Sequence, residues 1–334
     1  MEYVILLISL VGIVFGADYL VAGAVSIAKK YKVSDFVIGA AIVGVGTSMP
    51  ELVVSFIGAL QGNADVAIGN VVGSNIFNVL AILGLTAVFF PIAIDRNNMK
   101  FEIPFCIFVS VLLTVLALNF FNGTAATIGR IDGIVLLCMF ALYMWYSFYR
   151  DRKKSANAPV MKQEEAAEKV KTPLWLAIFK VTGGLAVLIT SCDFFIDNAV
   201  LIAKSFGVND AFISLTLIAC GTSLPELAAS LAAAFKKNTQ LALGNIVGSN
   251  IFNITWILGL SSQVMPLTSA GITSVDYIVM IIAAVVPLLL GFSISRNNGK
   301  AALVAGGKIN RLAGLVMFAG FVGYTWYLLS TQMA

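Results

Sequence analysis

Two short segments of the sequence carry residues suited to binding cations. Residues 46–52 read Gly-Thr-Ser-Met-Pro-Glu-Leu and residues 221–227 read Gly-Thr-Ser-Leu-Pro-Glu-Leu, each inside an otherwise apolar segment. A proline lacks an amide hydrogen and clashes with the carbonyl four residues earlier, so each copy should break its helix. The freed carbonyls, the hydroxyls and the carboxylates of Glu51 and Glu226 are hard oxygen ligands, which suit cations such as calcium.

Both glutamates are expected at the depth of the membrane interior. A charge there costs at least about 2.5 kcal/mol by insertion scales, so an acidic residue within a membrane segment indicates a functional site. Lys180 is the only basic residue in the interior of an expected span, away from the span ends, and it lies too near the inner third of its helix to neutralise both carboxylates. We therefore expect bound cations to supply the missing positive charge.

Hydroxyl and amide side chains share a helix face with the glutamates or with one another, because residues three or four apart lie together on a helix. The hydroxyl residues beside the glutamates are Thr47, Ser48, Thr222 and Ser223. The third and eighth expected spans add two pairs, Ser74 with Asn78 and Ser249 with Asn253. One such residue alone often serves only helix packing. Together with the glutamates, they are candidate ligands of the same cations.

The composition is that of a polytopic membrane protein, with 59% hydrophobic residues, 11% charged residues, no His and a mean hydropathy of +0.95. The cysteines fall inside expected spans without metal-ligand spacing, which argues against a disulfide framework. They are Cys106, Cys138, Cys192 and Cys220. We expect no enzyme activity, no cofactor and no nucleic-acid partner. The expected partners are the transported ions and the lipid bilayer.

Ten apolar runs are long enough to cross a membrane. They cover residues 3–27, 36–60, 66–91, 102–121, 128–149, 174–203, 211–235, 241–264, 275–294 and 310–330. Sorting the 21 Lys and Arg residues against these spans leaves only Arg130 and Lys204 in loops on one side and eighteen on the other. By the positive-inside rule, both termini are then expected outside, on the periplasmic side of a cell (inner) membrane.

The two halves of the chain repeat each other at a single offset of 175 residues. This offset places Glu51 on Glu226, Asp18 on Asp193, and residues 69–78 on 244–253. Five spans per half reverse the orientation of the second copy, and transporters with such inverted repeats bind substrate near the midplane on broken helices. The expected fold is therefore an all-α integral membrane protein with ten transmembrane helices in two inverted five-helix repeats. The halves are 1–149 and 174–334, joined by a cytoplasmic linker at 150–173.

Further polar residues leave two interpretations open. Asp18, Asp193 and Asp197 could line an access path or hold water near the site, or they could cap a loosened helix or bond across an interface. Ser34 and Asn209 precede the motif helices and are expected as N-caps.

The paired Gly-Thr-Ser-x-Pro-Glu-Leu and Gly-Asn-x-x-Gly-Ser-Asn-Ile-x-Asn motifs resemble the two alpha-repeats of the sodium/calcium exchanger family, within the cation/calcium exchanger superfamily. The resemblance covers the whole chain. It implies alternating access at a central cluster of ion sites, with Glu51 and Glu226 as shared calcium and sodium ligands. It also implies that spans one and six slide across the rest. The further ligands that it implies are Thr47, Ser48, Thr222, Ser223, Ser74, Ser249, Asn78, Asn253 and the carbonyls of Gly44 and Ala219.

One position departs from part of that family. Some prokaryotic members and the potassium-dependent branch carry Asp where this sequence has Asn253, which leaves stoichiometry and potassium dependence open. Proton-coupled cation exchangers have a different motif around their glutamate, so the motif favours sodium as the counter-ion. The leading hypothesis is a sodium/calcium antiporter that extrudes calcium. The alternatives are a calcium/proton antiporter and, from another class, a cation channel.

Overall fold

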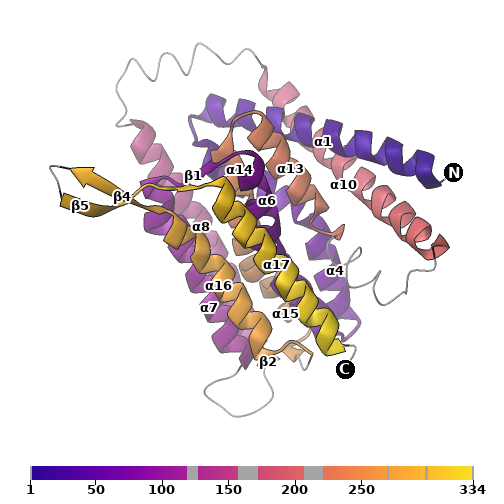
Figure 1. Ribbon diagram of the computed structural model, residues 1–334. Helices are drawn as coiled ribbons and strands as arrows, with labels where there is room; N and C mark the ends of the chain where they lie inside the picture. The colour runs from indigo at the N-terminus through magenta and orange to yellow at the C-terminus, as the bar shows by residue number, and fades with distance from the viewer. Residues whose placement is uncertain are drawn as a thin grey trace. The chain divides into compact units, whose positions relative to one another are not determined.

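The computed structural model describes residues 2–118, 127–156, 172–206, 221–268, 271–297 and 300–332. Helices dominate this part of the chain, and the strands are short (Figure 1). The α-helices are α1 (Glu2–Tyr31), α2 (Asp35–Ile38), α3 (Val45–Thr47), α4 (Met49–Leu60), α5 (Ala64–Ile76), α6 (Gly84–Phe89), α7 (Ile103–Leu118), α8 (Arg130–Ala156), α10 (Leu174–Ser205), α13 (Leu224–Phe235), α14 (Thr239–Phe252), α15 (Leu258–Val264), α16 (Ser274–Leu290) and α17 (Arg311–Gln332). Four π-helical segments interrupt or extend them: η1 (Gly39–Gly44), η2 (Phe77–Leu83), η3 (Asn98–Glu102) and η5 (Asn253–Ile257).

The helices account for the expected spans to different degrees. In the described residues, seven helices are long and apolar enough to cross a membrane, and an eighth candidate is the pair Asp35–Thr47 and Met49–Leu60, bent by 49°. The seventh expected span is described only from Gly221 onward, and the ninth holds the 17-residue helix α16. The helical membrane fold is confirmed, whereas the count of ten stays a prediction.

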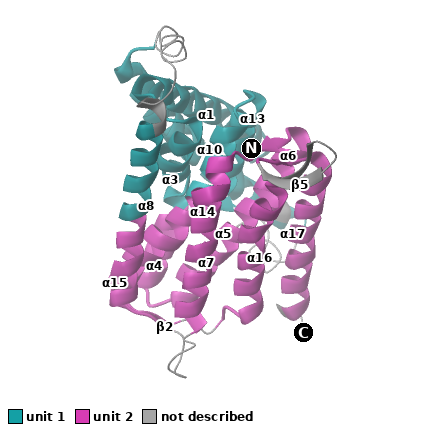
Figure 2. Ribbon diagram, turned by 90° about the vertical axis from the view of Figure 1, so that its left-hand side faces the viewer, with its two compact units in different colours: residues 1–50, 141–248 teal, residues 51–140, 249–334 magenta. Residues whose placement is uncertain are grey.

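The chain forms two compact units, and each draws on both halves of the sequence (Figure 2). Unit 1 contains Met1–Pro50 and Ala141–Gly248, and unit 2 contains Glu51–Phe140 and Ser249–Ala334. The division of the sequence into 1–149, 150–173 and 174–334 stays a prediction about the repeat. It does not coincide with how the helices pack.

Unit 1 is built around α1 and α10, which pack together along much of their length. Gly12 lies against Ser191, whereas Gly23 lies against Ala177, so the two helices run antiparallel. The backbones approach closely at Gly16, where an added Cβ atom would lie 2.6 Å from the backbone nitrogen of Leu188. Only glycine permits this backbone contact. Spans one and six are equivalent in the repeat, and their antiparallel packing is the orientation that an inverted repeat requires.

Unit 2 joins helices from the two halves through short strand pairs. Strand β1 (Ile92–Ala93) pairs with β6 (Lys308–Ile309), and β2 (Thr127–Ile128) pairs with β3 (Leu267–Thr268), both antiparallel. The first pair joins two loops expected on the cytoplasmic side, and the second joins two loops expected outside. Each strand pair thus joins loops that the ten-span model places on the same side of the membrane.

Contacts within unit 1 also join residues expected on the same side of the membrane. The Ser34 amide donates to the carboxylate of Asp151, and Asp35 is hydrogen-bonded to Asn238. All four residues belong to loops or helix ends expected on the cytoplasmic side. Ser34 also caps α2 by accepting a bond from the Val37 amide at 3.4 Å, as expected.

Several local features differ from the sequence expectation or fall outside the described residues. The strands were not expected, because two-residue strands leave no alternating pattern in the sequence. A longer hairpin, β4 (Phe292–Asn297) with β5 (Lys300–Ala305), begins where the ninth expected span was thought to continue. Residues 157–171 of the expected linker, and the expected N-cap Asn209, lie outside the described part. Cys220 also lies outside it, and none of the three described cysteines forms a disulfide with another: Cys106, Cys138 and Cys192.

Candidate functional site

The first Gly-Thr-Ser-Met-Pro-Glu segment breaks its helix, as the proline predicted. The chain passes from η1 through α3 to Ser48, whose φ of −82° and ψ of 13° are not helical, and α4 then starts at Met49. The break therefore falls at Ser48, two residues before Pro50. Pro50 sits in the first turn of α4, where its missing amide hydrogen costs no helical bond.

The second copy has the same local geometry in unit 1. Ser223 has a φ of −93° and a ψ of 8°, α13 starts at Leu224, and Pro225 lies in its first turn. The segment before the break spans residues 207–220 and lies outside the described residues. The expected carbonyl ligand at Ala219 falls in it.

Both glutamates are completely buried. Glu51 and Glu226 each have 0% exposure and lie in the first turn of α4 and α13. The amide groups at a helix N-terminus carry partial positive charge, which stabilises a carboxylate there. Thr47, Ser48 and Ser223 are also buried, and Thr222 is half-buried.

An asparagine holds the backbone of each glutamate in the same way. In unit 2, Asn70 donates its amide hydrogens to the Glu51 carbonyl at 3.1 Å and to Ser55 Oγ at 2.9 Å. In unit 1, Asn245 donates to the Glu226 carbonyl at 3.2 Å and to Ser230 Oγ at 2.9 Å. The 175-residue offset maps each of these three residues onto its counterpart. The repeat is therefore a repeat of hydrogen bonds as well as of sequence.

Within unit 1, the motif of one half contacts the motif of the other. The Ser48 hydroxyl donates to Oε1 of Glu226 at 2.7 Å. Thr47 donates to the carbonyl of Val43 at 2.9 Å and also lies 3.3 Å from Oδ1 of Asn245. A hydroxyl beside the first helix break thus solvates the carboxylate beside the second.

In unit 2, four asparagines form a network with approximate twofold symmetry. Asn75 donates to the Asn250 carbonyl at 3.2 Å, and Asn250 donates to the Asn75 carbonyl at 3.1 Å. Asn78 donates to Oδ1 of Asn250 at 3.0 Å, and Asn253 donates to Oδ1 of Asn75 at 3.2 Å. In the described residues, the Oδ1 atoms of Asn78 and Asn253 accept no hydrogen bond. These buried amide oxygens retain the capacity to bind a cation.

Two π-helical segments begin at this network. Segment η2 starts at Phe77, beside Asn78, and η5 starts at Asn253. A π-helix shifts the hydrogen-bond register and is frequent at functional sites. Here the shift coincides with the two amides that keep a free acceptor oxygen.

The structure distributes the expected ligands over the two units. Unit 1 holds Gly44, Thr47, Ser48, Thr222, Ser223 and Glu226. Unit 2 holds Glu51, Ser74, Asn78, Ser249 and Asn253. The Gly44 carbonyl already accepts a hydrogen bond from the Ser48 amide at 3.1 Å. The described residues contain no cluster of three or more His, Cys, Asp or Glu side chains.

Sequence reasoning overlooked the asparagines that act through hydrogen bonds rather than as ligands. They are Asn70, Asn75, Asn245 and Asn250. All four belong to the repeated block 69–78 and 244–253, so their recurrence at the 175-residue offset was an available signal. Of the glycines in that block, Gly248 lies against Ala40, whereas no described atom lies within 4 Å of a Cβ at Gly73.

The aspartates on α1 and α10 are exposed in unit 1. Asp18 forms an ion pair with Lys236 at 2.7 Å, which matches the expected alternative of bonding across an interface. Lys236 also donates to the Asp18 carbonyl at 2.8 Å. Asp193 and Asp197 are exposed on α10.

A helical membrane chain with duplicated broken helices, each bearing a buried glutamate beside hydroxyl and amide oxygens, has the architecture of a secondary transporter of cations. The comparison with known families agrees. Residues 1–149 and 176–330 match the family described as sodium/calcium exchanger protein. The chain belongs to this family, whose members exchange ions across membranes, and its function is cation/calcium antiport.

Individual relatives cover almost the whole chain. CaxA of Alkalimonas amylolytica is 37% identical over 329 residues, covering 98% of both proteins. The sodium/calcium exchanger MaX1 of Methanosarcina acetivorans is 31% identical over 350 residues, covering 97% of both. A solved structure of the sodium-calcium exchanger NCX_Mj, soaked with zero sodium and calcium, is similar with a TM-score of 0.79 and 29% identity, covering 98% of each chain. This similarity confirms the expected exchanger fold.

Proposed function

We propose that this protein exchanges sodium for calcium, with calcium leaving the cytoplasm as sodium enters. Glu51 and Glu226 are the acidic ligands of both ions. Hydroxyl, amide and carbonyl groups of the repeated motifs complete the coordination: Thr47, Ser48, Thr222, Ser223, Ser74, Asn78, Ser249 and Asn253, with the carbonyls of Gly44 and Ala219.

The observation that carries this proposal is the matched support of the two glutamates. Each is buried in the first turn of a helix that follows a break, and each has its carbonyl held by an asparagine nineteen residues later. A buried carboxylate is stable only with compensating charge or hydrogen bonds. Burying a carboxylate is unfavourable, and this chain does so twice with the same hydrogen bonds. The duplication supports the same role for both glutamates, which is binding the transported cations.

The donor set supports hard cations. Carboxylate, carbonyl, hydroxyl and amide oxygens are the ligands that calcium takes, usually six to eight in number. Two glutamates supply two negative charges when ionised, which one calcium ion or two sodium ions neutralise. This equality of charge is a physical basis for exchange at shared ligands.

The orientation follows from charge placement. The basic residues gather in loops of one side, which supports a cytoplasmic location for these loops and periplasmic termini in a cell membrane. Calcium extrusion from the cytoplasm is the direction in which an inward sodium gradient would drive the exchange.

Uptake of radioactive calcium into proteoliposomes at clamped pH tests the proposal. Vesicles loaded with sodium and diluted into sodium-free buffer should accumulate calcium, and choline-loaded vesicles at the same pH should not. Accumulation driven by an imposed proton gradient without sodium would instead support calcium/proton antiport. A calcium flux that rises linearly with concentration and needs no counter-ion would support a channel.

A further inference from the structure

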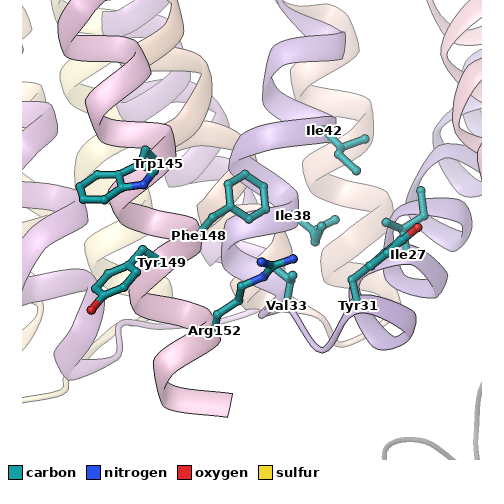
Figure 3. Close-up of a pocket in the computed structure, with 9 residues that line it drawn as sticks. All are labelled: Ile27, Tyr31, Val33, Ile38, Ile42, Trp145, Phe148, Tyr149 and Arg152. Atoms are coloured by element: carbon teal, nitrogen blue, oxygen red, sulfur yellow. The ribbon is translucent and has the colours of Figure 1, made fainter. Parts of the chain in front are cut away.

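Unit 1 contains a groove separate from the glutamates and asparagines described above (Figure 3). Its volume is about 490 Å³, and nine residues of α1, α2, η1, α8 and the segment after α1 line it. Val33 and Ile38 form one side, and Phe148 of α8 faces them, with Tyr31 of α1 on the far side (Figure 3). Arg152 is the only charged residue in this lining.

The groove has an apolar interior and a basic mouth. Ile27, Ile38, Ile42 and Phe148 supply aliphatic and aromatic surface. At the mouth, the Arg152 guanidinium extends from α8 toward Val33 (Figure 3). This polarity suits a molecule with a hydrocarbon portion and an anionic head.

The charge around the mouth is strongly positive. Residues 27–38 and 145–153 together carry six basic side chains and two acidic ones. The acidic residues are both engaged, since Asp151 accepts a bond from the Ser34 amide and Asp35 is hydrogen-bonded to Asn238 and lies near Lys29. An anion at Arg152 would therefore meet a net excess of positive charge.

Aromatic side chains mark this region as a membrane interface. Trp145 is 64% exposed, Tyr149 is 52% exposed, and their rings stack with centroids 5.7 Å apart on α8. Tyr31, at the end of α1, is 51% exposed. Trp and Tyr gather at the level of lipid headgroups, where one end of the ring system is apolar and the other is hydrated.

We propose that this groove binds one anionic phospholipid. Its phosphodiester lies at Arg152, and an acyl chain lies against Ile38, Ile42 and Phe148. Basic pockets between transmembrane helices on the cytoplasmic side bind anionic headgroups by the same chemistry. A zwitterionic lipid would place its ammonium group among these basic residues and would bind less well.

Native mass spectrometry of the full chain tests the proposal. The protein in detergent is equilibrated with equal amounts of phosphatidylglycerol and phosphatidylcholine, and the bound lipids are counted. The parent should retain one phosphatidylglycerol in preference to phosphatidylcholine. Arg152→Gln should lower this retention by about fivefold, the contribution of one basic side chain near an anionic headgroup.

Lys153→Gln is the matched control, because it removes the same charge from an exposed neighbour that does not line the groove. It should change retention by less than about twofold, since a headgroup within the groove contacts Arg152 directly. Val33→Trp, which fills the groove without changing charge, should also displace the lipid. The thermal unfolding midpoint of each variant, measured in parallel, identifies any variant that fails to fold.

Three results would overturn the proposal. Equal loss in Arg152→Gln and Lys153→Gln would indicate diffuse surface charge rather than a site. Equal retention of both lipids by the parent would indicate nonspecific contact. Displacement by inorganic phosphate at the lipid concentration would indicate a soluble anion instead of a lipid.

Discussion

The hydroxyl of Ser48 donates a hydrogen bond of 2.7 Å to the carboxylate of Glu226, a residue 178 positions later in the chain. Ser48 is the non-helical residue of the first break, and Glu226 follows the second break. Unit 1 thus joins the two repeated motifs by a direct contact. Within unit 1, groups from both halves of the chain therefore lie at the same glutamate.

This contact predicts a specific loss in Ser48→Ala. A hydrogen bond to a charged group contributes about 1.5 to 3 kcal/mol, so calcium affinity should fall by roughly tenfold or more if Glu226 is positioned by Ser48. Equilibrium binding of calcium by the purified protein measures this. Ser26→Ala is the control, because the Ser26 hydroxyl donates to the Ala22 carbonyl of its own helix, away from both motifs, and the calcium affinity of this variant should remain that of the parent. Equal affinities in all three proteins would contradict the positioning role.

The asparagines that hold the glutamate carbonyls give the second prediction. Asn70→Ala and Asn245→Ala should each weaken calcium binding by about tenfold to a hundredfold, as residues that orient metal ligands commonly do. The Asp variants should fail in the same way, because each asparagine donates its bonds and an ionised carboxylate cannot. Asn245 also approaches Thr47 at 3.3 Å, so its loss should cost more than that of Asn70.

Each of these asparagines also donates a hydrogen bond to a serine, Ser55 or Ser230, and substitution of that serine provides the control. Ser55→Ala and Ser230→Ala remove one partner but leave the asparagine bonded to the glutamate carbonyl. Their calcium affinities should stay within about threefold of the parent, which corresponds to a small part of one hydrogen bond. If the serine variants lost as much affinity as the asparagine variants, the bond to the carbonyl would not be the one that matters.

The amide at Asn253 predicts independence from potassium. Asn253 uses its amide hydrogens on Asn75, and its Oδ1 is buried without a hydrogen bond in the described residues. Because Asn253 is neutral, Glu51 and Glu226 are the only acidic groups among the proposed ligands. Calcium uptake driven by sodium should therefore be the same with and without potassium.

Two substitutions of Asn253 test separately whether its side-chain oxygen and its neutral charge matter for transport. Asn253→Asp adds a third ionisable carboxyl group and replaces the NH₂ group that donates to Oδ1 of Asn75 with an oxygen. Sodium affinity should therefore change, and a new dependence of uptake on pH should appear. Asn253→Ala removes the oxygen and should reduce uptake at every pH. Normal transport by the Ala variant together with a parental pH profile in the Asp variant would place this residue outside the ion site.

The orientation predicted from basic residues is tested by labelling. In a background without the native cysteines, a cysteine at position Ser155 should resist a membrane-impermeant thiol reagent in intact cells, and a cysteine at Gln332 should react. Permeabilised cells provide the control, in which both positions should react. The reverse pattern in intact cells would invert the topology and leave the repeat unaffected.

The sequence was informative where one residue type dictates local geometry. Pro50 and Pro225 lack an amide hydrogen, so a helix had to start near each of them, and both do lie in a first helical turn. The non-helical residues are Ser48 and Ser223, two positions before each proline, because a proline is accommodated within the first turn of the helix that follows. The opposite directions of α1 and α10 followed from the odd number of spans in each half, which reverses equivalent helices, whereas their packing against each other was seen only in the structure.

Features that depend on tertiary distance were not accessible in this way. Asn70 and Glu51 are nineteen residues apart, and no helical period relates two residues on separate helices. The π-helical segment that begins at Asn253 joins backbone groups five residues apart instead of four, and this local difference is not recorded by apolar periodicity. Each unit combines segments from both halves of the chain. This arrangement likewise depends on packing, so the repeat in the sequence did not reveal it.

Calcium binding to the glutamate variants tests the central claim most directly. Isothermal titration should give a binding site in the parent that is lost in both Glu51→Gln and Glu226→Gln, because the uncharged amide keeps the side-chain shape and removes half of the acidic charge. Glu102→Gln, a buried glutamate outside the motifs, should bind calcium as the parent does. If both motif variants retained calcium binding of near-parental affinity, the two glutamates would not be ligands of a shared calcium ion.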